Sequence, residues 1–596
     1  MKRYAADFET TTCVPARVWA WGVACTDDPD TVQTGETIDS FIEWCRDTKN
    51  PVIYFHNEKF DGSFILYYLL KNGYVWKRTK GECSEKEFTT IIDNYGKFYA
   101  IEIYWHRKGH KVNKCTIYDS FKIIPMSVDK AAKNFGLSIS KLEIDYDAHN
   151  EPGKPVTKQE WDYLHNDVSI MAQVLRIAFD YGLTKMTIGA CALADYKKFI
   201  GERRFECFFP KVPYDVDCQM RTAYKGGWCY ANPDHTNEDC TEGLVFDVNS
   251  LYPSQMAYRP LPWGIPQTFD GEYEPDEKYP LYIQRLRCSF ELKPGYLPTI
   301  QLKHNGLFSP TEYLKDSGGE IVDLCLCSCD LELMKKHYFM HFTEYYGGWK
   351  FHARSDMFTA WIEKWAGEKA RADKEGNKAL RQICKLLMNN LYGKFSTNPK
   401  RRSKYPVYSI SQDCVCYRPI ITKCTTKDGK PQLNENGEQL ETDFEIRDAV
   451  YLPVGAYITA WARYTTITAA QAIHEKSLKE TGVSRFCYSD TDSIHVIGTE
   501  LPDNIDIDPY RLGAWKHEST FKRARFIQAK RYIEDELQDD GTSELKVTCA
   551  GMPAACHKFV TWENFRNGNS FPGKLVPKTV PGGTVLVETS YTMKGE

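Results

Sequence analysis

Residues 246–253 are Phe246-Asp247-Val248-Asn249-Ser250-Leu251-Tyr252-Pro253, and they follow the apolar run Gly243-Leu244-Val245. This pattern predicts a strand that ends in a turn, with Asp247 at its mouth. A second acidic stretch lies far downstream, at Tyr488-Ser489-Asp490-Thr491-Asp492-Ser493. Its aspartates alternate with one intervening residue, which predicts that both lie on one face of a strand or hairpin. An isolated Asp-x-Asp is usually a solvated turn, but the flanking residues and the upstream element favour a catalytic site.

Carboxylates brought together from distant segments are typical ligands of hard divalent cations. We expect Asp247 and Asp492 to bind two Mg²⁺ ions, with Mn²⁺ as the alternative. Such ions lower the pKa of a primer 3′-hydroxyl and neutralise a triphosphate. The two stretches therefore predict a nucleotidyl-transfer site.

Between the acidic stretches, the sequence predicts a strongly helical region over about 355–395. Its cations are spaced by three and four residues and are predicted to form one continuous basic stripe: Arg371, Lys374, Lys378, Arg381 and Lys385. Such a stripe is more often a solvated face, but no acid interrupts residues 377–394. The region ends in Asn389-Asn390-Leu391-Tyr392-Gly393-Lys394. This composition suits binding of a triphosphate and stacking of a base on Tyr392.

A separate set of acids lies near the N-terminus. Asp7 and Glu9 end a short predicted strand and point to the same side. Residues 54–61 predict a strand and a turn that presents Asn57 and Asp61, and Asp167 follows on a helix. Four carboxylates in one pocket would repel each other unless cations neutralised them. We therefore expect a second pair of Mg²⁺ ions, at a site that hydrolyses a phosphodiester.

The helix that carries Asp167 is predicted to begin near Thr157, because Thr157 and Glu160 can form a capping box. Tyr163 lies four residues before Asp167 and therefore shares its helix face. We expect the Tyr163 phenol to orient the attacking water. At this point the pattern resembles the DEDD exonucleases of the tyrosine subtype.

Composition limits the alternatives. The chain has 596 residues, enough for three or four domains or subdomains, and its net charge of −4 excludes a generally basic nucleic-acid coat. The sequence lacks an apolar membrane segment and enters a strand at once, so we expect no membrane association and a reducing cytoplasm. The 21 cysteines are scattered. The spacing of Cys325, Cys327 and Cys329 predicts packing on one strand face rather than a metal site.

The motifs occur in the order found in family B DNA polymerases: Ser250-Leu251-Tyr252-Pro253, the helix from Lys385 to Gly393, residues 488–493 and Lys530-Arg531-Tyr532. Residues 461–470 and 517–524 are similar to the protein-primed branch of the phage phi-twenty-nine type. The resemblance covers nearly the whole chain. It implies an α/β and α+β multidomain fold, in which an RNase H-like exonuclease domain precedes a right-hand polymerase with two inserted subdomains.

The resemblance implies further roles in the polymerase site. Val248 assists the metal ligands through its carbonyl, and Asp490 supports them. Tyr252 is the steric gate against ribonucleotides. The remaining nucleotide contacts implied are Arg371, Arg381, Lys385, Asn389 and Tyr392. The implied DNA contacts are Lys530 and Tyr532 at the primer terminus, together with Tyr224, Gly226 and Gly227 in a motif that passes the primer between sites.

In the exonuclease, the family implies metal ligation by Asp7, Glu9, Asp61 and Asp167, catalysis by Tyr163, and an auxiliary catalytic lysine, Lys141. The implied single-strand ligands are Thr10, His56, Asn57, Phe60, Ser120 and Phe121. The implied partners are template and primer DNA, deoxynucleotides, a terminal protein as primer and a single-strand-binding protein. The protein would act as a monomer, or as a heterodimer with the terminal protein, in the cytoplasm of an infected bacterium.

The family also predicts the division of the chain: exonuclease 1–188, palm 189–258 and 450–544, an insertion contacting terminal protein 259–352, fingers 353–396, a second insertion for processivity and strand displacement 397–449, and thumb 545–596. The second insertion is longer than we expect for this branch, and hairpin turns are predicted in it at Lys427-Asp428-Gly429 and Asn436-Gly437.

Three other interpretations are less favoured. A family B polymerase that extends ordinary nucleic-acid primers would carry the same catalytic motifs. A replication scaffold with decayed sites would be expected to have lost at least one of the acids. A nuclease alone would leave the basic helix and residues 488–493 unexplained.

Overall fold

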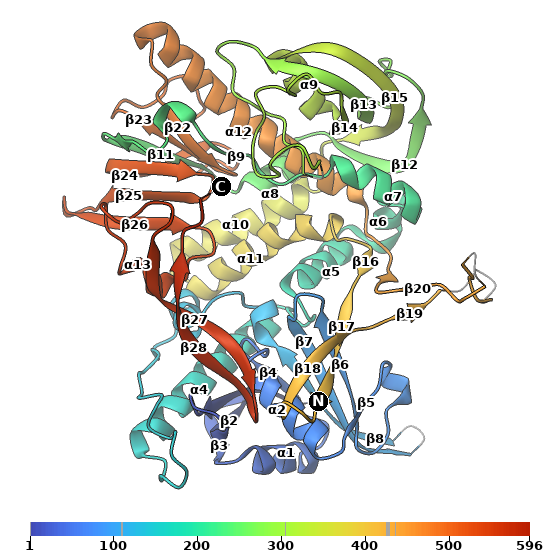
Figure 1. Cartoon of the computed structure of the whole chain (residues 1–596), viewed down its shortest axis with the longest axis vertical. Coiled ribbons are helices and arrows are strands. Elements are labelled where there is room, and N and C mark those ends of the chain that lie inside the picture. The colour runs from blue at the N-terminus through green and yellow to red at the C-terminus, as the bar shows by residue number, and fades with distance from the viewer. Residues whose placement is uncertain (1, 109–110, 304, 425–429, 435–436, 596) are drawn as a thin grey trace.

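Strands of the N-terminal part, together with β17 and β18 from much later in the chain, form a mixed sheet in the order β18-β17-β6-β7-β8-β4-β1-β2-β3, with β5 paired to β6 (Figure 1). β1, β4 and β8 are parallel neighbours at its centre. The strands are β1 (Arg3–Thr10), β2 (Val18–Cys25), β3 (Asp28–Gly35), β4 (Val52–Phe55), β5 (Val75–Trp76), β6 (Glu87–Asp93), β7 (Phe98–Lys108), β8 (Lys111–Asp119), β17 (Ser403–Ser409) and β18 (Cys414–Pro419). This computed structural model describes residues 2–595 apart from 109–110, 304, 425–429 and 435–436.

Alternation along β1 directs side chains into two cores. Tyr4, Ala6 and Phe8 pack against α1 (Ile38–Asp47) and α2 (Asp61–Lys71). Ala5 lies on the opposite face, with α3 (Val128–Phe135) and α4 (Lys158–Asp180). The predicted start of α4 is confirmed, since Thr157 and Glu160 form a capping box. Asp7 and Glu9 have the parity of Ala5 and therefore point toward α4.

A second, antiparallel sheet has the order β26-β25-β24-β11-β23-β22-β9, and β10 pairs with β24. Its strands are β9 (Cys229–Ala231), β10 (Asp239–Cys240), β11 (Gly243–Val248), β22 (Phe486–Asp490), β23 (Ser493–Ile497), β24 (Trp515–Gln528), β25 (Arg531–Leu537) and β26 (Ser543–Cys549). Leu244 and Phe246 pack on one face with the long helix α12 (Leu452–Thr481). Val245 faces a separate core on the other side.

The third sheet has the order β12-β15-β13-β14, with β12 (Leu261–Phe269), β13 (Leu281–Leu292), β14 (Val322–Cys327) and β15 (Tyr338–Arg354), and it packs with α9 (Ser328–His337). The expectation of one strand face for the three cysteines was wrong, because β14 ends at Cys327 and Cys329 lies in α9. Their packing role holds: Cys327 and Cys329 are buried in the core, and Cys325 packs against it.

Helices α5 (Ile188–Ile200), α6 (Glu202–Phe208) and α7 (Tyr214–Met220) connect the N-terminal sheet to the second sheet, and α8 (Leu251–Tyr258) leads from β11 to the third sheet. The predicted continuous basic helix was wrong: the region forms two helices, α10 (Thr359–Glu375) and α11 (Lys378–Phe395). Gly376 has a φ of +68° and ends α10, and Asn377 then caps α11, because its side chain accepts a hydrogen bond from the Leu380 amide. Glycine adopts this left-handed conformation readily, so the chain reverses here.

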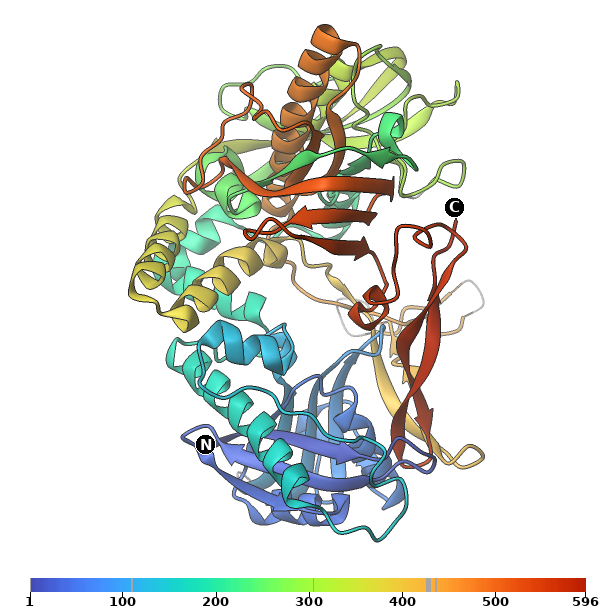
Figure 2. The ribbon, with the colours of Figure 1, turned by 90° about the vertical axis from the view of Figure 1, so that its left-hand side faces the viewer.

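Two segments distant in sequence return to the N-terminal part. β17 pairs with the edge strand β6, through Ser403 and Asp93. The C-terminal hairpin of β27 (Ser570–Val580) and β28 (Gly583–Thr592) reaches the N-terminal part at its turn, where the Ala16 amide donates to the Pro581 carbonyl (2.8 Å). Figure 2 shows both segments on the side opposite to α10 and α11, so the two ends of the molecule are joined on both sides.

The structure confirms the predicted fold class, a mixed α/β and α+β multidomain chain whose N-terminal unit precedes the sheet that carries Asp247. The predicted turn at Lys427-Asp428-Gly429 and residue Asn436 of the other turn lie outside the described residues. Within the part of the chain that is described, no helix combines the length and apolar character needed to cross a membrane.

Candidate active sites

The four N-terminal acids converge from three elements. Asp7 and Glu9 come from β1, Asp61 is the first residue of α2, and Asp167 projects from the middle of α4. Glu9, Asp61 and Asp167 are 6%, 4% and 3% exposed. Burial and the neighbouring Asp167 raise the pKa of Asp7 to about 7. Burial and the other acids likewise raise the pKa of Glu9 and Asp61 well above their ordinary values.

This arrangement fits a cation site. Mutual repulsion means that the acids release their protons most readily when a positive charge is bound between them. Among the described residues, Asp167 Oδ1 has no hydrogen-bond partner although it is buried. Its other oxygen, Oδ2, accepts from Lys141 Nζ at 2.7 Å. One carboxylate oxygen is thus available to a metal ion while the other is held by Lys141.

Tyr163 lies beside these acids as its spacing predicted. Its side chain is buried, and its hydroxyl lies 3.2 Å from the hydroxyl of Tyr146. Lys141 Nζ lies 5.3 Å from the centre of the Tyr163 ring. Burial and the nearby Asp167 raise the pKa of Tyr163, so the phenol keeps its proton and can donate a hydrogen bond.

The predicted single-strand ligands lie next to this cluster. The imidazole Nε2 of His56 donates to the Met126 carbonyl at 2.7 Å, and its Nδ1 lies 3.0 Å from Ser120 Oγ. The ring of Phe121 is edge-on to His56 and 37% exposed, which leaves an aromatic surface for a base. Asn57 has a φ of +69°, and its amide donates to Asp119. Phe60 precedes Asp61 at the start of α2, and Thr10 ends β1.

The second carboxylate site lies on the antiparallel sheet. Asp247 is in β11, opposite Ser493 of β23, and the Val248 amide donates to the Asp492 carbonyl (2.8 Å). Asp492 itself occupies the turn between β22 and β23, where Thr491 has a φ of +64°. The predicted hairpin is therefore present. Burial and then Asp492 raise the pKa of Asp247 to about 7, and the pKa of Asp492 is also raised by burial.

Asp490 does not face this pair as an open ligand. Its Oδ1 accepts from Lys530 Nζ at 2.9 Å and from the thiol of Cys229 at 2.9 Å. The Lys530 amide donates to the hydroxyl of Tyr488 at 2.7 Å, and the ring of Tyr532 lies 4.8 Å from that of Tyr488. The predicted primer contacts Lys530 and Tyr532 are thus tied to the hairpin that bears the acids.

The basic residues of α11 form an exposed face above Asp247, with Arg381, Lys385 and Asn389 spaced by four residues. Lys385 is one of the cations that lower the pKa of Asp247, while burial and Asp492 raise it. Arg381 pairs with Asp373 of α10. Arg371 lies on α10 rather than α11, and it pairs there with Glu368 and Glu375.

Sequence reasoning missed Lys369. It is half-buried on α10, and its pKa is lowered by burial and then by Arg381, with Lys385 also contributing. Recognition of the Gly376 stop would have indicated it: Lys369 lies about two helical turns before the reversal and Lys385 about two turns after it, so the two meet across the hairpin. Lys374, the other cation of the predicted stripe on this helix, lies exposed in the last turn of α10.

Aromatic and glycine residues complete the second site. The rings of Tyr252 and Tyr392 are stacked with centres 4.3 Å apart. Burial raises the pKa values of Tyr252 and Tyr392, and the nearby Tyr224 adds a smaller contribution to both. A Cβ on Gly227 would lie 2.5 Å from Thr491 Cγ2, so only glycine fits against the hairpin. The carbonyl of Gly226 accepts from the buried Arg463 at 2.8 Å.

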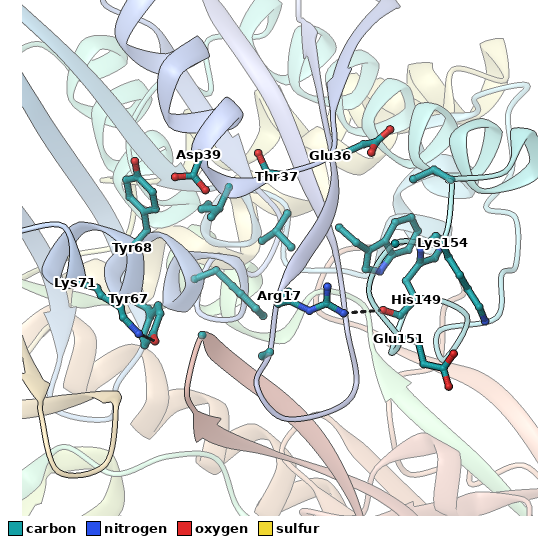
Figure 3. Close-up of a pocket in the computed structure, with 18 of the residues that line it drawn as sticks. Arg17, Glu36, Thr37, Asp39, Tyr67, Tyr68, Lys71, His149, Glu151 and Lys154 are labelled. Atoms are coloured by element: carbon teal, nitrogen blue, oxygen red, sulfur yellow. Dashed lines mark hydrogen bonds between the residues drawn. The ribbon is translucent and has the colours of Figure 1, made fainter.

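A cavity of about 550 Å³ lies elsewhere on the N-terminal part, lined by Arg17, Trp19, Lys71 and His149 among others (Figure 3). The rings of Trp19 and His149 are stacked with centres 4.0 Å apart, and Arg17 donates to the His149 carbonyl. None of the predicted site residues lines it. The two carboxylate clusters, rather than this cavity, are therefore the candidate active sites.

The second sheet holds Asp247 and Asp492 close to the basic residues of the α10–α11 hairpin. This is the arrangement of a nucleic-acid polymerase. The chain belongs to the family described as "DNA polymerase type B, organellar and viral", whose profile matches residues 42–160 and 149–508. It is 42% identical to the DNA polymerases of Bacillus phages B103 and phi29 over its whole length, covering 100% and 99% of those proteins. It is 31% identical to the DNA polymerase of Streptococcus phage Cp-1, with 99% of this chain and 98% of that protein covered.

Solved structures agree. Phi29 DNA polymerase in complex with primer-template DNA and incoming nucleotide substrates matches with a TM-score of 0.89 at 41% identity, over 100% of both chains. The same values are found for that protein in complex with single-stranded DNA. The chain is therefore a DNA-directed DNA polymerase of the phi29 type.

Proposed function

We propose that this DNA polymerase also proofreads, by removing nucleotides from the 3′ end of DNA at the N-terminal carboxylate site. The observation that supports this proposal is a second cluster of four mutually repelling acids, in which the buried Asp167 Oδ1 is unpartnered within the described chain. Asp7, Glu9, Asp61 and Asp167 would hold two Mg²⁺ ions, which supply an activated water and stabilise the leaving oxygen. Tyr163, with Lys141 beside it, would orient that water.

The adjoining residues suit a single strand that ends in this site. Phe121 and Phe60 offer aromatic surface, and Asn57 and Thr10 offer polar groups for sugar and phosphate. Ser120 is buried and hydrogen-bonds to His56, so these two residues would support the surface that the strand contacts. Stacking and backbone contacts of this kind bind any base sequence, as proofreading requires.

For polymerisation, Asp247, the Val248 carbonyl and Asp492 would hold two Mg²⁺ ions, with Asp490 supporting the hairpin. Arg381 and Lys385, joined by Lys369, would bind the triphosphate of the incoming nucleotide, because charge-assisted contacts to phosphate are strong. Asn389 and Tyr392 would contact that nucleotide and the nascent pair, and Tyr252 would exclude the ribose 2′-hydroxyl.

The primer strand would meet Lys530 and Tyr532 at its terminus. Gly227 packs against the catalytic hairpin at Thr491, and Tyr224, Gly226 and Gly227 would guide the strand between the two sites. In this proposal residues 189–258 and 450–544 act as palm, 353–396 as fingers and 545–596 as thumb, beside the exonuclease domain at 1–188.

The test is extension and degradation of a 5′-labelled primed template by wild type, Asp492→Asn and the double variant Asp7→Ala/Glu9→Ala, each with and without deoxynucleotides. We expect wild type to extend with nucleotides and to degrade without them. Asp492→Asn should only degrade, and the double variant should only extend. Loss of both activities in either variant would show that the two sites are not separate.

We further propose that synthesis begins on a terminal protein, which residues 259–352 would contact. The support is full-length similarity to the phage polymerases and the residues 461–470 and 517–524 of the protein-primed pattern. Labelled deoxynucleotide should become covalently attached to a co-purified terminal protein in the absence of any DNA primer. Extension of DNA primers alone would instead indicate the ordinary primer-dependent type.

Strand displacement and processivity are the remaining parts of the proposal. The support is that β17 pairs with β6 and that the Ala16 amide donates to the Pro581 carbonyl, so a part of the second insertion and the C-terminal hairpin both contact the N-terminal part, where they could help to surround DNA. Copying of a primed single-stranded circle should give products longer than the circle. The enzyme would work in the cytoplasm of an infected bacterium, alone or as a heterodimer with the terminal protein, and with a single-strand-binding protein.

A further inference from the structure

Three side chains outside both carboxylate sites bring metal-binding atoms together. His235, Cys240 and Cys487 place one donor atom each within 4.8 Å of one another, and all three are buried. They are 8%, 6% and 0% exposed. The polymerase chemistry described above uses none of them.

The fold holds each donor by its main chain. Cys487 lies at an irregularity in β22, where the register to β23 shifts between Phe486 and Tyr488. A bulge of this kind re-aims a side chain. Cys240 lies in β10, opposite Ala524 of β24. Cys240 and Cys487 therefore come from two strands, β10 and β22, that pair with β24 and β23 on opposite sides of β11.

His235 ends the short 3₁₀ helix Pro233–His235, which is fixed to β22. The Asn232 amide donates to the Cys487 carbonyl at 2.8 Å, and Asn232 Nδ2 donates to the Phe486 carbonyl at 2.8 Å. Two contacts from one residue thus set the distance between the His235 segment and the strand that carries Cys487.

The tautomer of His235 also favours a ligand role. Its Nε2 donates to the Ser484 carbonyl at 2.7 Å, so Nε2 carries the proton and Nδ1 keeps a lone pair. Histidines that bind metals usually donate their other ring nitrogen to a carbonyl or carboxylate in this way. The two thiols interact with each other, and their contacts to carbonyls are weak: Cys487 Sγ lies 3.5 Å from Arg485 O, and Cys240 Sγ lies 4.0 Å from His235 O.

We propose that His235, Cys240 and Cys487 bind one thiolate-preferring metal ion, Zn²⁺ or Cu⁺. Two sulfurs and an imidazole select such ions over Mg²⁺. Donors around Zn²⁺ lie roughly 3.5 Å apart, so the group needs to contract only slightly. Three donors complete a trigonal Cu⁺ site, whereas Zn²⁺ would take a water or carbonyl as fourth ligand. Binding displaces the thiol protons to solvent, with no change of oxidation state.

A bound ion would join β10, the His235 segment and β22, and β22 leads directly into Asp490 and the turn with Asp492.

The test uses full-length protein, reduced under anaerobic conditions, stripped with a chelator and kept in excess Mg²⁺ so that the carboxylate sites are filled. Zn²⁺ and Cu⁺ are titrated in separate arms against chromophoric chelators, and Cd²⁺ is added to detect thiolate-to-metal charge-transfer absorption. We expect one ion per chain, a thiolate band with Cd²⁺, and a higher thermal midpoint with the preferred ion.

Cys240→Ser should weaken binding at least about 100-fold and abolish the charge-transfer band. Cys45→Ser is the matched control, because Cys45 and Cys115 are a buried thiol pair that no third donor joins within the described residues. It should leave binding unchanged. If Cys240→Ser does not fold, His235→Gln provides the second measurement, with an expected loss of similar size.

The proposal is overturned if the reduced wild-type protein binds neither Zn²⁺ nor Cu⁺. It is also overturned if the wild-type protein binds one ion and both Cys240→Ser and His235→Gln retain that ion. It is also overturned if Cys45→Ser removes the ion as fully as Cys240→Ser does. Formation of a Cys240–Cys487 disulfide on exposure to air, without metal binding by the reduced protein, would show an oxidisable thiol pair instead of a metal site.

Discussion

Replacement of Asp247 by asparagine should stabilise the metal-free polymerase at pH 8 while it abolishes primer extension. Burial and Asp492 raise the pKa of Asp247 from 3.8 to about 7, so above neutral pH the folded protein holds a charge that it disfavours. Asparagine has the same shape and no charge. The substitution therefore relieves repulsion at the cost of a metal ligand.

The sign follows from linkage. A carboxyl whose pKa is raised by folding contributes stability below its unfolded value, and that contribution is lost as pH rises through the folded value. The window for Asp247 runs from 3.8 to about 7. The full difference corresponds to roughly 4 kcal/mol. Because Asp247 is partly exposed, solvent screening reduces this figure, and we expect about 1–2 kcal/mol.

The assay is thermal unfolding with a chelator present, at pH 5 and pH 8. Asp247→Asn should raise the midpoint by about 1–2 °C at pH 8 and by much less at pH 5, where the wild-type carboxyl is largely protonated. Added Mg²⁺ at pH 8 should raise the wild-type midpoint more than that of the variant.

Asp239→Asn is the control with the opposite sign. Although burial raises it, the ion pairs with Arg525 and Arg523 hold the pKa of Asp239 below its ordinary value. Its replacement should therefore destabilise the protein at pH 8. The reasoning would be refuted if Asp247→Asn destabilised the metal-free protein at pH 8, or if its effect were equal at both pH values.

Three further outcomes are expected. Lys369→Ala should raise the KM for deoxynucleotides about tenfold or more, because a phosphate contact is lost. Arg371→Ala should leave this KM nearly unchanged in the same steady-state assay. Equal effects of the two substitutions would contradict the assignment. Tyr252→Val should raise incorporation of ribonucleotides at least about tenfold in single-nucleotide extension, and unchanged discrimination would remove Tyr252 from the gate. Gly227→Ala should slow extension about tenfold or more, because the added methyl group displaces Thr491, while degradation without nucleotides is retained. Adding Thr491→Ser to this variant should restore part of the extension rate. Full extension activity of Gly227→Ala would show that this contact is unimportant.

Much of the candidate chemistry could be predicted from the sequence, because it is written in short, local patterns. The capping box of Thr157 and Glu160 fixed the start of α4, and the spacing of Tyr163 and Asp167 placed both on one helix face. The chain reversal at Gly376 and Asn377 could also have been predicted locally, because a helix-ending glycine is followed by a helix-capping asparagine. The regular spacing of the cations favoured one continuous helix instead. Lys369 was missed for the same reason.

The sequence alone determined which residue types carry the chemistry and which strand or helix presents them, since alternation and helical spacing act over a few residues. Only the tertiary structure decided which distant groups meet. The pairing of β17 with β6, the nearness of Lys369 to the cations Arg381 and Lys385, and the convergence of His235, Cys240 and Cys487 each involve segments that are distant in sequence. Such contacts depend on how whole elements pack around shared cores, and local periodicity contains no information about that packing.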